Sequence, residues 1–206
     1  RMAHLPGPVA AAVGMAAVIG AEGDTRTLAA ALGAAAGAVV ELLEQARASR
    51  LLDLAAPGRW MFAHDLVRDA VYRGLGEAER ARSHVAALEA FEAGAATLAP
   101  VLAHHALSAQ PLLDADRTVA LVTRAGEAAL AQYAYEEAIH WFEQASKMLP
   151  LDAAPDQRAE LQARFGEACR QAGEIERARA AFLEAARTTS DPSLLTRAAL
   201  GYADPG

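Results

Sequence analysis

The 206-residue sequence contains one cysteine and one lysine. Aromatic residues make up only 5% of the chain. The single cysteine, Cys169, excludes an internal disulfide framework and fits the reducing conditions of the cytoplasm. Since Cys169 lies in an alanine-rich helical stretch, we predict a buried and inert thiol.

Sequence motifs of common enzyme classes are also missing. A P-loop needs Gly-Lys-Ser/Thr to hold phosphates, but the only lysine, Lys147, is followed by Met148. Neither the Gly-x-Ser-x-Gly motif of hydrolases nor the His-Glu-x-x-His motif of zinc proteases occurs. We therefore expect that this chain is not an enzyme and has no catalytic residue, no cofactor and no metal site of its own.

The histidines do not change this expectation. His104 and His105 are adjacent, and neighbouring side chains on a helix point about 100° apart, so they cannot chelate one ion as a pair four residues apart would. We predict that they are hydrogen-bonded or solvated, and we expect the same of His84 and His140.

Charge and hydropathy limit the class of partner. A formal net charge of −7 argues against a polyanion-binding surface over the whole molecule. The longest apolar run, residues 9–20, is too short and too rich in alanine and glycine to cross a bilayer. We predict a core helix there, no membrane contact and a cytoplasmic location. Because the chain opens on Arg1 and ends like a truncated helix, we expect a piece of a longer protein.

Abundant alanine, the best helix former, favours packed helices. Residues 1–75 combine helices with a two-stranded hairpin around the Pro57-Gly58 turn. We predict helices over residues 9–19, 25–32 and 36–50, a loop over 20–24, strands over 51–54 and 59–62, and a helix over 65–75. Three helices and a hairpin are typical of a winged helix-turn-helix, which we assign to residues 1–75.

The remainder, residues 76–206, is predicted to be helical and contains an internal repeat. Ala125-Gly126-Glu127-Ala128 matches Phe165-Gly166-Glu167-Ala168, and Ala138, Phe142 and Ala145 match Ala178, Phe182 and Ala185, with the same separation in every pair. This pattern resembles the tetratricopeptide repeat, a helical hairpin with a basic period of about 34 residues. The separation here is longer, and the extra length is assigned to a loop over residues 151–156. A third unit begins at Leu200-Gly201.

The repeat pattern predicts how the two helices of a hairpin pack. Small residues at Gly126, Ala138 and Ala145 let the helices approach, and Phe142 fills the space between them. Tyr133 stands where such repeats have glycine, which predicts an irregular first turn.

The predicted fold is therefore mainly α: a winged helix-turn-helix with a small β-hairpin, followed by an α-α superhelix of tetratricopeptide-like repeats. By resemblance to peptide-binding repeats, the superhelix has a concave groove lined by Thr123, Glu127, Glu167, Arg170 and Gln171. An ordinary solvated helix face is the alternative interpretation, because the mixture of charges identifies no ligand.

At Ala63-His64-Asp65 the strand pattern changes to a helical one. An imidazole beside a helix N-terminus can meet a phosphate, because the first backbone N–H groups are unpaired and the helix dipole is positive there. From the residues alone, a histidine that packs on Trp60 or caps its own helix is the alternative.

The motif Ala63-His64-Asp65 resembles the Met-His-Asp motif of STAND signalling NTPases, with alanine in the methionine position. The segments Met15–Gly20, Phe62–Tyr72 and Arg80–His84 resemble the region that follows the ATPase core in large ATP-binding regulators of the LuxR type, which are related in plan to MalT-like activators. The resemblance implies a regulatory segment: a winged-helix domain followed by the start of a sensor arm.

In such a protein the resemblance gives His64 a contact with the β-phosphate of ADP, while Asp65 holds the helix start and orients the imidazole. ADP or ATP would be held by the parent's own nucleotide-binding domain, which this chain lacks. An inducer or partner (a protein, peptide or small molecule) would engage the repeat arm.

Two other functions remain open. One is a freestanding tetratricopeptide-repeat scaffold that binds a protein or peptide. The other is a DNA-binding winged helix, in which the helix over residues 36–50 would enter the major groove. That helix carries Glu41, Glu44, Arg47 and Arg50, which balance to zero, whereas a DNA reader presents a basic face. We therefore expect no DNA contact by this chain.

Overall fold

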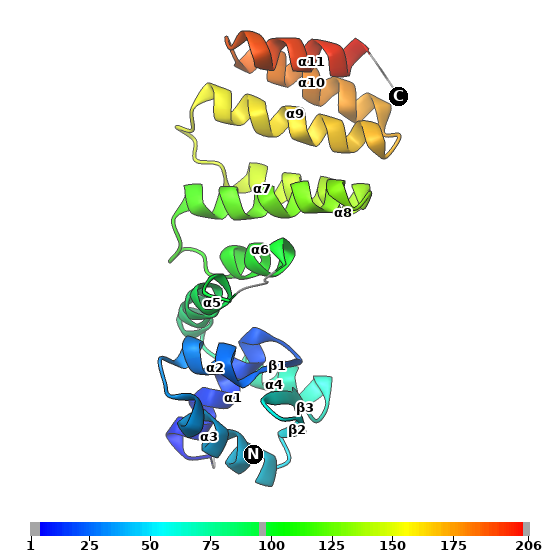
Figure 1. Cartoon of the computed structure of the whole chain (residues 1–206). Helices are drawn as coiled ribbons and strands as arrows, with labels where there is room; N and C mark the ends of the chain where they lie inside the picture. The colour runs from blue at the N-terminus through cyan, green and yellow to red at the C-terminus, as the bar shows by residue number, and fades with distance from the viewer. Residues whose placement is uncertain (1–4, 95–97, 204–206) are drawn as a thin grey trace. The chain divides into compact units, whose positions relative to one another are not determined.

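The fold is described from a computed structural model, which places residues 5–94 and 98–203. The chain is mainly helical, as predicted, and forms two compact units (Figure 1). The first unit comprises the described residues up to 94 together with 108–112, and the second comprises 98–107 and the described residues from 113 onward. The sequence placed the domain boundary after residue 75, whereas the compact units divide between residues 94 and 98.

The first unit is built around a central helix. Its helices are α1 (Gly7–Ile19), α2 (Thr25–Leu32), α3 (Ala36–Ala48), α4 (Asp65–Gly74) and α5 (Glu77–Glu92). The helix α1 is buried along most of its length and packs against the other four, which its alanine-rich surface permits. Because α5 packs on α1 and α2, it belongs to this unit, beyond the boundary expected from the sequence.

Three antiparallel strands, in the order β1-β3-β2, form the sheet of the first unit: β1 (Glu22–Asp24), β2 (Leu52–Ala56) and β3 (Arg59–Phe62). The β2–β3 hairpin was predicted and is confirmed. The prediction of a loop over residues 20–24 was wrong, because three residues are too few to show strand alternation. Their strand arises from pairing with β3, where Gly23 lies opposite Trp60.

That pairing explains the glycine. A Cβ at Gly23 would lie 2.5 Å from Cζ2 of Trp60, so a side chain there would displace the indole. Trp60 is fully buried and contacts Phe62 edge to face, with 6.2 Å between ring centroids. The side chain of Asp24 then caps α2 by accepting a 2.9 Å hydrogen bond from the backbone N–H of Thr27.

The second unit consists of helices alone in its described residues: α6 (Ala99–Ser108), α7 (Ala115–Ala131), α8 (Tyr135–Met148), α9 (Pro155–Gln171), α10 (Ile175–Thr188) and α11 (Pro192–Ala203). The pairs α7–α8 and α9–α10 are helical hairpins whose bounds are offset by the same number of positions throughout, which confirms the internal repeat (Figure 1). The last helix, α11, packs against α9 and α10.

Each hairpin is closed by a glycine facing a phenylalanine. A Cβ at Gly126 would lie 2.6 Å from the ring of the fully buried Phe142, and one at Gly166 would lie 3.1 Å from the ring of Phe182. Gly201 of α11 contacts the same Phe182 ring from the next helix. The predicted role of the small residues is therefore confirmed, because larger side chains would separate the helices.

The two hairpin turns have the same hydrogen bonds. Tyr133 adopts a φ of 60° and Gly173 a φ of 78°. The N–H of Ala134 bonds to the carbonyl of Ala129, and the equivalent N–H of Glu174 bonds to that of Cys169, at 2.9 and 2.8 Å. The prediction of an irregular first turn was therefore wrong: the helix C-terminus imposes the left-handed conformation on a tyrosine.

The connection between the hairpins is as long as the predicted loop over residues 151–156 but lies two positions earlier in the chain. The helix α8 ends at Met148 and α9 begins at Pro155, so two residues assigned to the loop belong to α9. Proline favours the first turn of a helix, where its missing N–H costs no hydrogen bond.

Within residues 5–94 and 98–203, no single helix combines the length and apolarity needed to cross a membrane, although the bent pair α2–α3 passes on length and composition alone.

Candidate functional site

Two regions carry the residues predicted to have a function: the start of α4 in the first unit and the inner face of the repeats in the second. At the start of α4, His64 is the N-terminal capping residue in an extended conformation, with φ −154° and ψ 144°. Its carbonyl oxygen accepts hydrogen bonds from the N–H groups of Val67 and Arg68, at 2.9 and 3.3 Å. The backbone geometry thus turns β3 directly into α4.

The side chains of this turn are exposed. His64 caps α4 through its backbone carbonyl, whereas its imidazole makes no capping hydrogen bond to the described residues of the helix. The side chains of His64 and Asp65 are exposed, and so is the large apolar side chain of Leu66 beside them. We call these three residues the His64 corner.

The helix behind the His64 corner is held firmly. Arg68 donates from Nε to the carbonyl oxygen of Ala17 in α1 at 3.2 Å, and its guanidinium pairs with Asp69 at 3.3 Å. One turn later Val71 is buried in the core of the first unit. The corner therefore presents exposed side chains on a backbone that these contacts hold to α1.

The C-terminal half of α4 is joined to α5 by a buried histidine. The hydroxyl of Tyr72 lies 2.9 Å from Nε2 of His84, which is buried, so the prediction of a hydrogen-bonded His84 is confirmed. The guanidinium of Arg80 stacks on the Tyr72 ring, 5.5 Å from its centroid. These contacts link the helix that begins at the His64 corner to the helix that follows it.

The helix α3, which would enter the major groove if the chain bound DNA, carries an ion pair between two of its own residues. Arg47 contacts Glu44 at 3.3 Å, so one of the cations is partly neutralised by a carboxylate on the same helix. This ion pair does not favour phosphate binding by α3.

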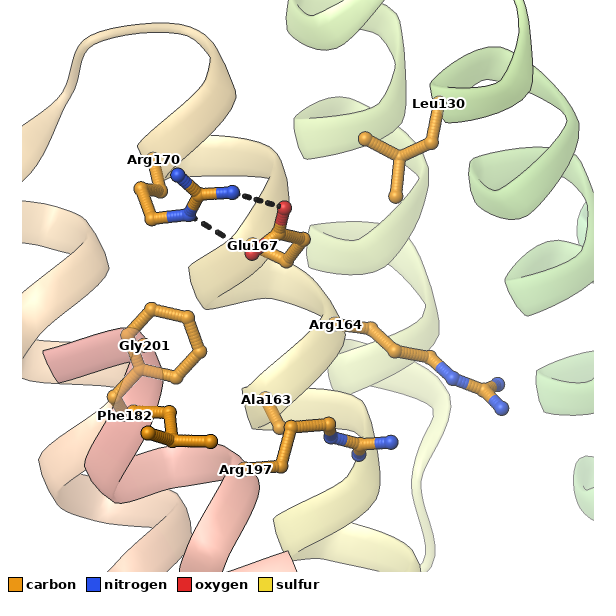
Figure 2. Close-up of a pocket in the computed structure, with 9 residues that line it drawn as sticks. Leu130, Ala163, Arg164, Glu167, Arg170, Phe182, Arg197 and Gly201 are labelled. Atoms are coloured by element: carbon orange, nitrogen blue, oxygen red, sulfur yellow. Dashed lines mark hydrogen bonds and ion pairs between the residues drawn. The ribbon is translucent and has the colours of Figure 1, made fainter. Parts of the chain in front are cut away.

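In the second unit, two hollows lie along the face to which α7, α9 and α11 contribute, which we call the inner face of the repeats. Both hollows are lined in part by Arg164. The larger, about 540 Å³, is the arginine pocket (Figure 2), lined by Leu130, Ala163, Arg164, Glu167, Arg170, Phe182, Arg197, Leu200 and Gly201. The smaller, about 330 Å³, is the acidic pocket, lined by Asp116, Val119, Ala120, Thr123, Arg124, Glu127, Gln157, Glu160, Leu161 and Arg164.

The predicted groove residues divide between these hollows. Thr123 and Glu127 line the acidic pocket, while Glu167 and Arg170 line the arginine pocket. Gln171 lines neither pocket, and its amide instead donates a 2.8 Å hydrogen bond to Glu167. The structure thus brings four of the five to the pockets.

A chain of ion pairs runs across the inner face and was not predicted. Arg164 of α9 contacts Glu127 of α7 at 2.8 Å and Glu160 of its own helix at 2.9 Å. Glu160 also pairs with Arg197 of α11. The spacing of Glu160 and Arg164 by four residues could have indicated their pairing on a helix, but the partners from α7 and α11 depend on how the helices pack.

A separate ion pair, between Arg170 and Glu167, forms the upper wall of the arginine pocket in Figure 2. Arg170 binds Glu167 through two hydrogen bonds, of 3.0 Å from Nε and 2.7 Å from Nη2. Burial alone would raise the pKa of Glu167, but the hydrogen bonds from Arg170 and Gln171 and the charge of Arg170 outweigh it and lower the pKa. Glu167 is therefore a fixed carboxylate at neutral pH.

The apolar part of the arginine pocket comes from three helices. Phe182 of α10 is buried, and Leu130 of α7 and the exposed Leu200 of α11 contribute aliphatic side chains. An apolar floor beside charged groups suits a ligand that carries both kinds of surface.

Cys169 lies behind this face, in the core of the second unit. Burial raises the pKa of its thiol to about 11, and nearby Glu174 and Glu143 add to this against the opposing charge of Arg177. The predicted burial of Cys169 is confirmed, and the raised pKa keeps the thiol protonated at neutral pH, the form that is a poor nucleophile. In the described residues no group of three or more metal-ligating side chains comes together.

No protein-family model, curated protein or solved structure matches this chain. The observations that bear on function are therefore the His64 corner, the joint between α4 and α5, and the two pockets on the repeats.

Proposed function

We propose that this chain is the regulatory and sensor segment of a STAND-class ATP-dependent transcriptional regulator of the LuxR type. In this proposal the His64 corner faces a nucleotide held by the parent protein's own nucleotide-binding domain, in the cytoplasm. The repeats form the arm on which an inducer or partner binds, and the chain couples the two events without performing catalysis.

The observation that carries the proposal is the exposed imidazole of His64, which lies at the N-terminus of α4 and makes no capping hydrogen bond to that helix. A phosphate placed there would meet the backbone N–H groups of the first helical turn, the positive end of the helix dipole and an imidazole. The exposed Leu66 adds an apolar contact for a domain that covers the corner.

The architecture supports the same assignment. Three helices followed by the β2–β3 hairpin fit a winged helix-turn-helix, extended by β1. Paired helices with matched glycine–phenylalanine contacts fit tetratricopeptide-like repeats. The hydrogen bond between Tyr72 and His84 connects α4 to α5, the helix that precedes the second unit in the sequence.

The test is a His64→Ala substitution in the full-length parent protein, with His140→Ala as the control, because His140 is also exposed but lies on α8. We expect the His64 variant to retain less ADP after purification and to show a higher basal activity, since a contact with the β-phosphate is lost. The control should match the unmodified protein. Unchanged ADP retention together with an unchanged inducer response in the His64 variant would contradict the proposal.

The two pockets favour a second candidate, a freestanding repeat scaffold that binds a protein or peptide. It differs in a measurable way, since a scaffold binds its partner with the same affinity whatever the nucleotide and whatever residue stands at position 64. For the DNA-binding alternative, the pairing of Arg47 with Glu44 offers no support. Absence of binding to duplex DNA at low salt would remove it.

A further inference from the structure

The two pockets on the inner face of the repeats have opposite formal charge. The arginine pocket is lined by three arginines and one glutamate, an excess of two positive charges. The acidic pocket is lined by three carboxylates and two arginines, an excess of one negative charge. On a chain of net charge −7, a basic pocket is a local exception and not a general property of the surface.

The ion pairs that connect the pockets fix this polarity. In order across α7, α9 and α11, the charges are Glu127, Arg164, Glu160 and Arg197. The inner two side chains are 35% and 29% exposed and are held between partners, whereas the outer two, Glu127 and Arg197, are 45% and 49% exposed. A ligand can therefore reach an acidic end at Glu127 and a basic end at Arg197 without breaking the inner pairs.

Apolar side chains line both pockets, but Val119 and Leu161 of the acidic pocket are buried. In the arginine pocket, Leu130 is half-buried and Leu200 is exposed, so the accessible apolar surface lies in the pocket that also contains Arg197. The basic end of the groove thus offers an apolar floor next to its cation. A ligand that matches it carries an apolar group and a carboxylate close together.

We propose that the groove binds an extended peptide with an apolar residue and an acidic residue in the arginine pocket, and a basic residue in the acidic pocket. This inference rests on the binding role of the repeats in the proposed function and adds the chemistry of the partner. An extended chain advances about 3.3 Å per residue, so a peptide of eight residues spans roughly 26 Å.

The test measures binding of capped eight-residue peptides to the 206-residue chain by isothermal titration calorimetry. The first peptide carries lysine near one end and Leu-Glu near the other, separated by serine and glycine. Its matched relatives replace the lysine by glutamate, the glutamate by lysine, or the leucine by serine. We expect each replacement to weaken binding about tenfold or more, and a serine-glycine peptide of the same length not to bind.

Variants of the protein locate the peptide. Arg197→Glu should weaken the first peptide at least tenfold and strengthen the relative in which lysine replaces glutamate, because the basic end becomes acidic. Glu127→Gln should weaken only the peptides that carry lysine at the end that binds in the acidic pocket. Arg187→Glu is the matched control, since Arg187 is exposed on α10 and lines neither pocket. Circular dichroism checks that each variant remains helical, which the partial exposure of Arg197 and Glu127 permits.

Equal affinity for all four charged peptides, no binding of the first peptide, or an unchanged preference in the Arg197→Glu variant would each overturn the inference. The proposed function has a separate readout, ADP retention by the His64→Ala parent. A negative peptide result with altered ADP retention removes only the peptide assignment, while the reverse pattern keeps the groove and removes the nucleotide role.

Discussion

The hairpins α7–α8 and α9–α10 have the same length and the same turn hydrogen bonds, yet they differ in how their helices meet and in how their turns are made. The contact between Gly126 and Phe142 is tighter than that between Gly166 and Phe182. The first turn holds a tyrosine in a left-handed conformation that the second gives to Gly173. The comparison shows that the interhelical contact tolerates less variation than the turn, because the contact has no free space and the turn is open to solvent.

The largest effect is expected from emptying the space between the helices. Replacing Phe142 or Phe182 by alanine should lower the free energy of unfolding by about 3–5 kcal/mol, since each ring is buried and leaves a cavity. Chemical denaturation followed by circular dichroism measures the loss. Phe165→Ala is the control: Phe165 is only half-buried and stacks with Arg177, so it should cost clearly less. A similar loss at all three positions would contradict the assignment of the repeat cores.

The next effect distinguishes the two hairpins directly. Alanine at Gly126 would place its Cβ 2.6 Å from the Phe142 ring, and overpacking of this kind costs about 1–3 kcal/mol. Alanine at Gly166 meets Phe182 at 3.1 Å, so a small shift of the ring suffices, and the better helix propensity of alanine offsets the cost. We expect Gly126→Ala to be less stable than Gly166→Ala by at least about 1 kcal/mol in the same denaturation experiment. Equal stabilities would show that the Phe142 ring yields as easily as the Phe182 ring.

The turns should respond in opposite directions. Gly173→Ala forces a Cβ into a left-handed conformation and should cost about 1 kcal/mol. Tyr133→Gly relieves the same strain, but glycine also gains freedom in the unfolded chain, so the gain should stay below about 1 kcal/mol. Thermal denaturation of both variants tests the comparison, and destabilisation by Tyr133→Gly would mean that the exposed ring, which contacts Tyr135, holds the turn.

What could be predicted from the sequence follows the same division between local and packed features. The helices, the β2–β3 hairpin and the contact of Gly126 with Phe142 were predicted, because helical period, turn residues and the internal repeat are patterns that the sequence shows directly. The strand β1 was missed because only its pairing with β3 makes it a strand. Of the site, Glu167 and Arg170 were predicted as groove residues, whereas Arg197 was not. Its place in the groove depends on how α11 packs on α9, which no spacing in the sequence encodes.

The smallest effect concerns Glu167, the carboxylate of the second hairpin that corresponds to Glu127 in the first. Because hydrogen bonds from Arg170 and Gln171 hold the pKa of Glu167 below its ordinary value of 4.5, its ionised form stabilises the folded chain above that pH. The contribution is lost as the pH falls through the lowered pKa, where the carboxylate becomes protonated in the folded state as well. Glu167→Gln should therefore cost less than about 1 kcal/mol at pH 7, as expected for a partly exposed ion pair, and almost nothing at a pH below the folded-state pKa. Denaturation of this variant and of Arg170→Met across that range measures the effect, and a loss that does not change with pH would assign the stabilisation to packing of the side chain instead of its charge.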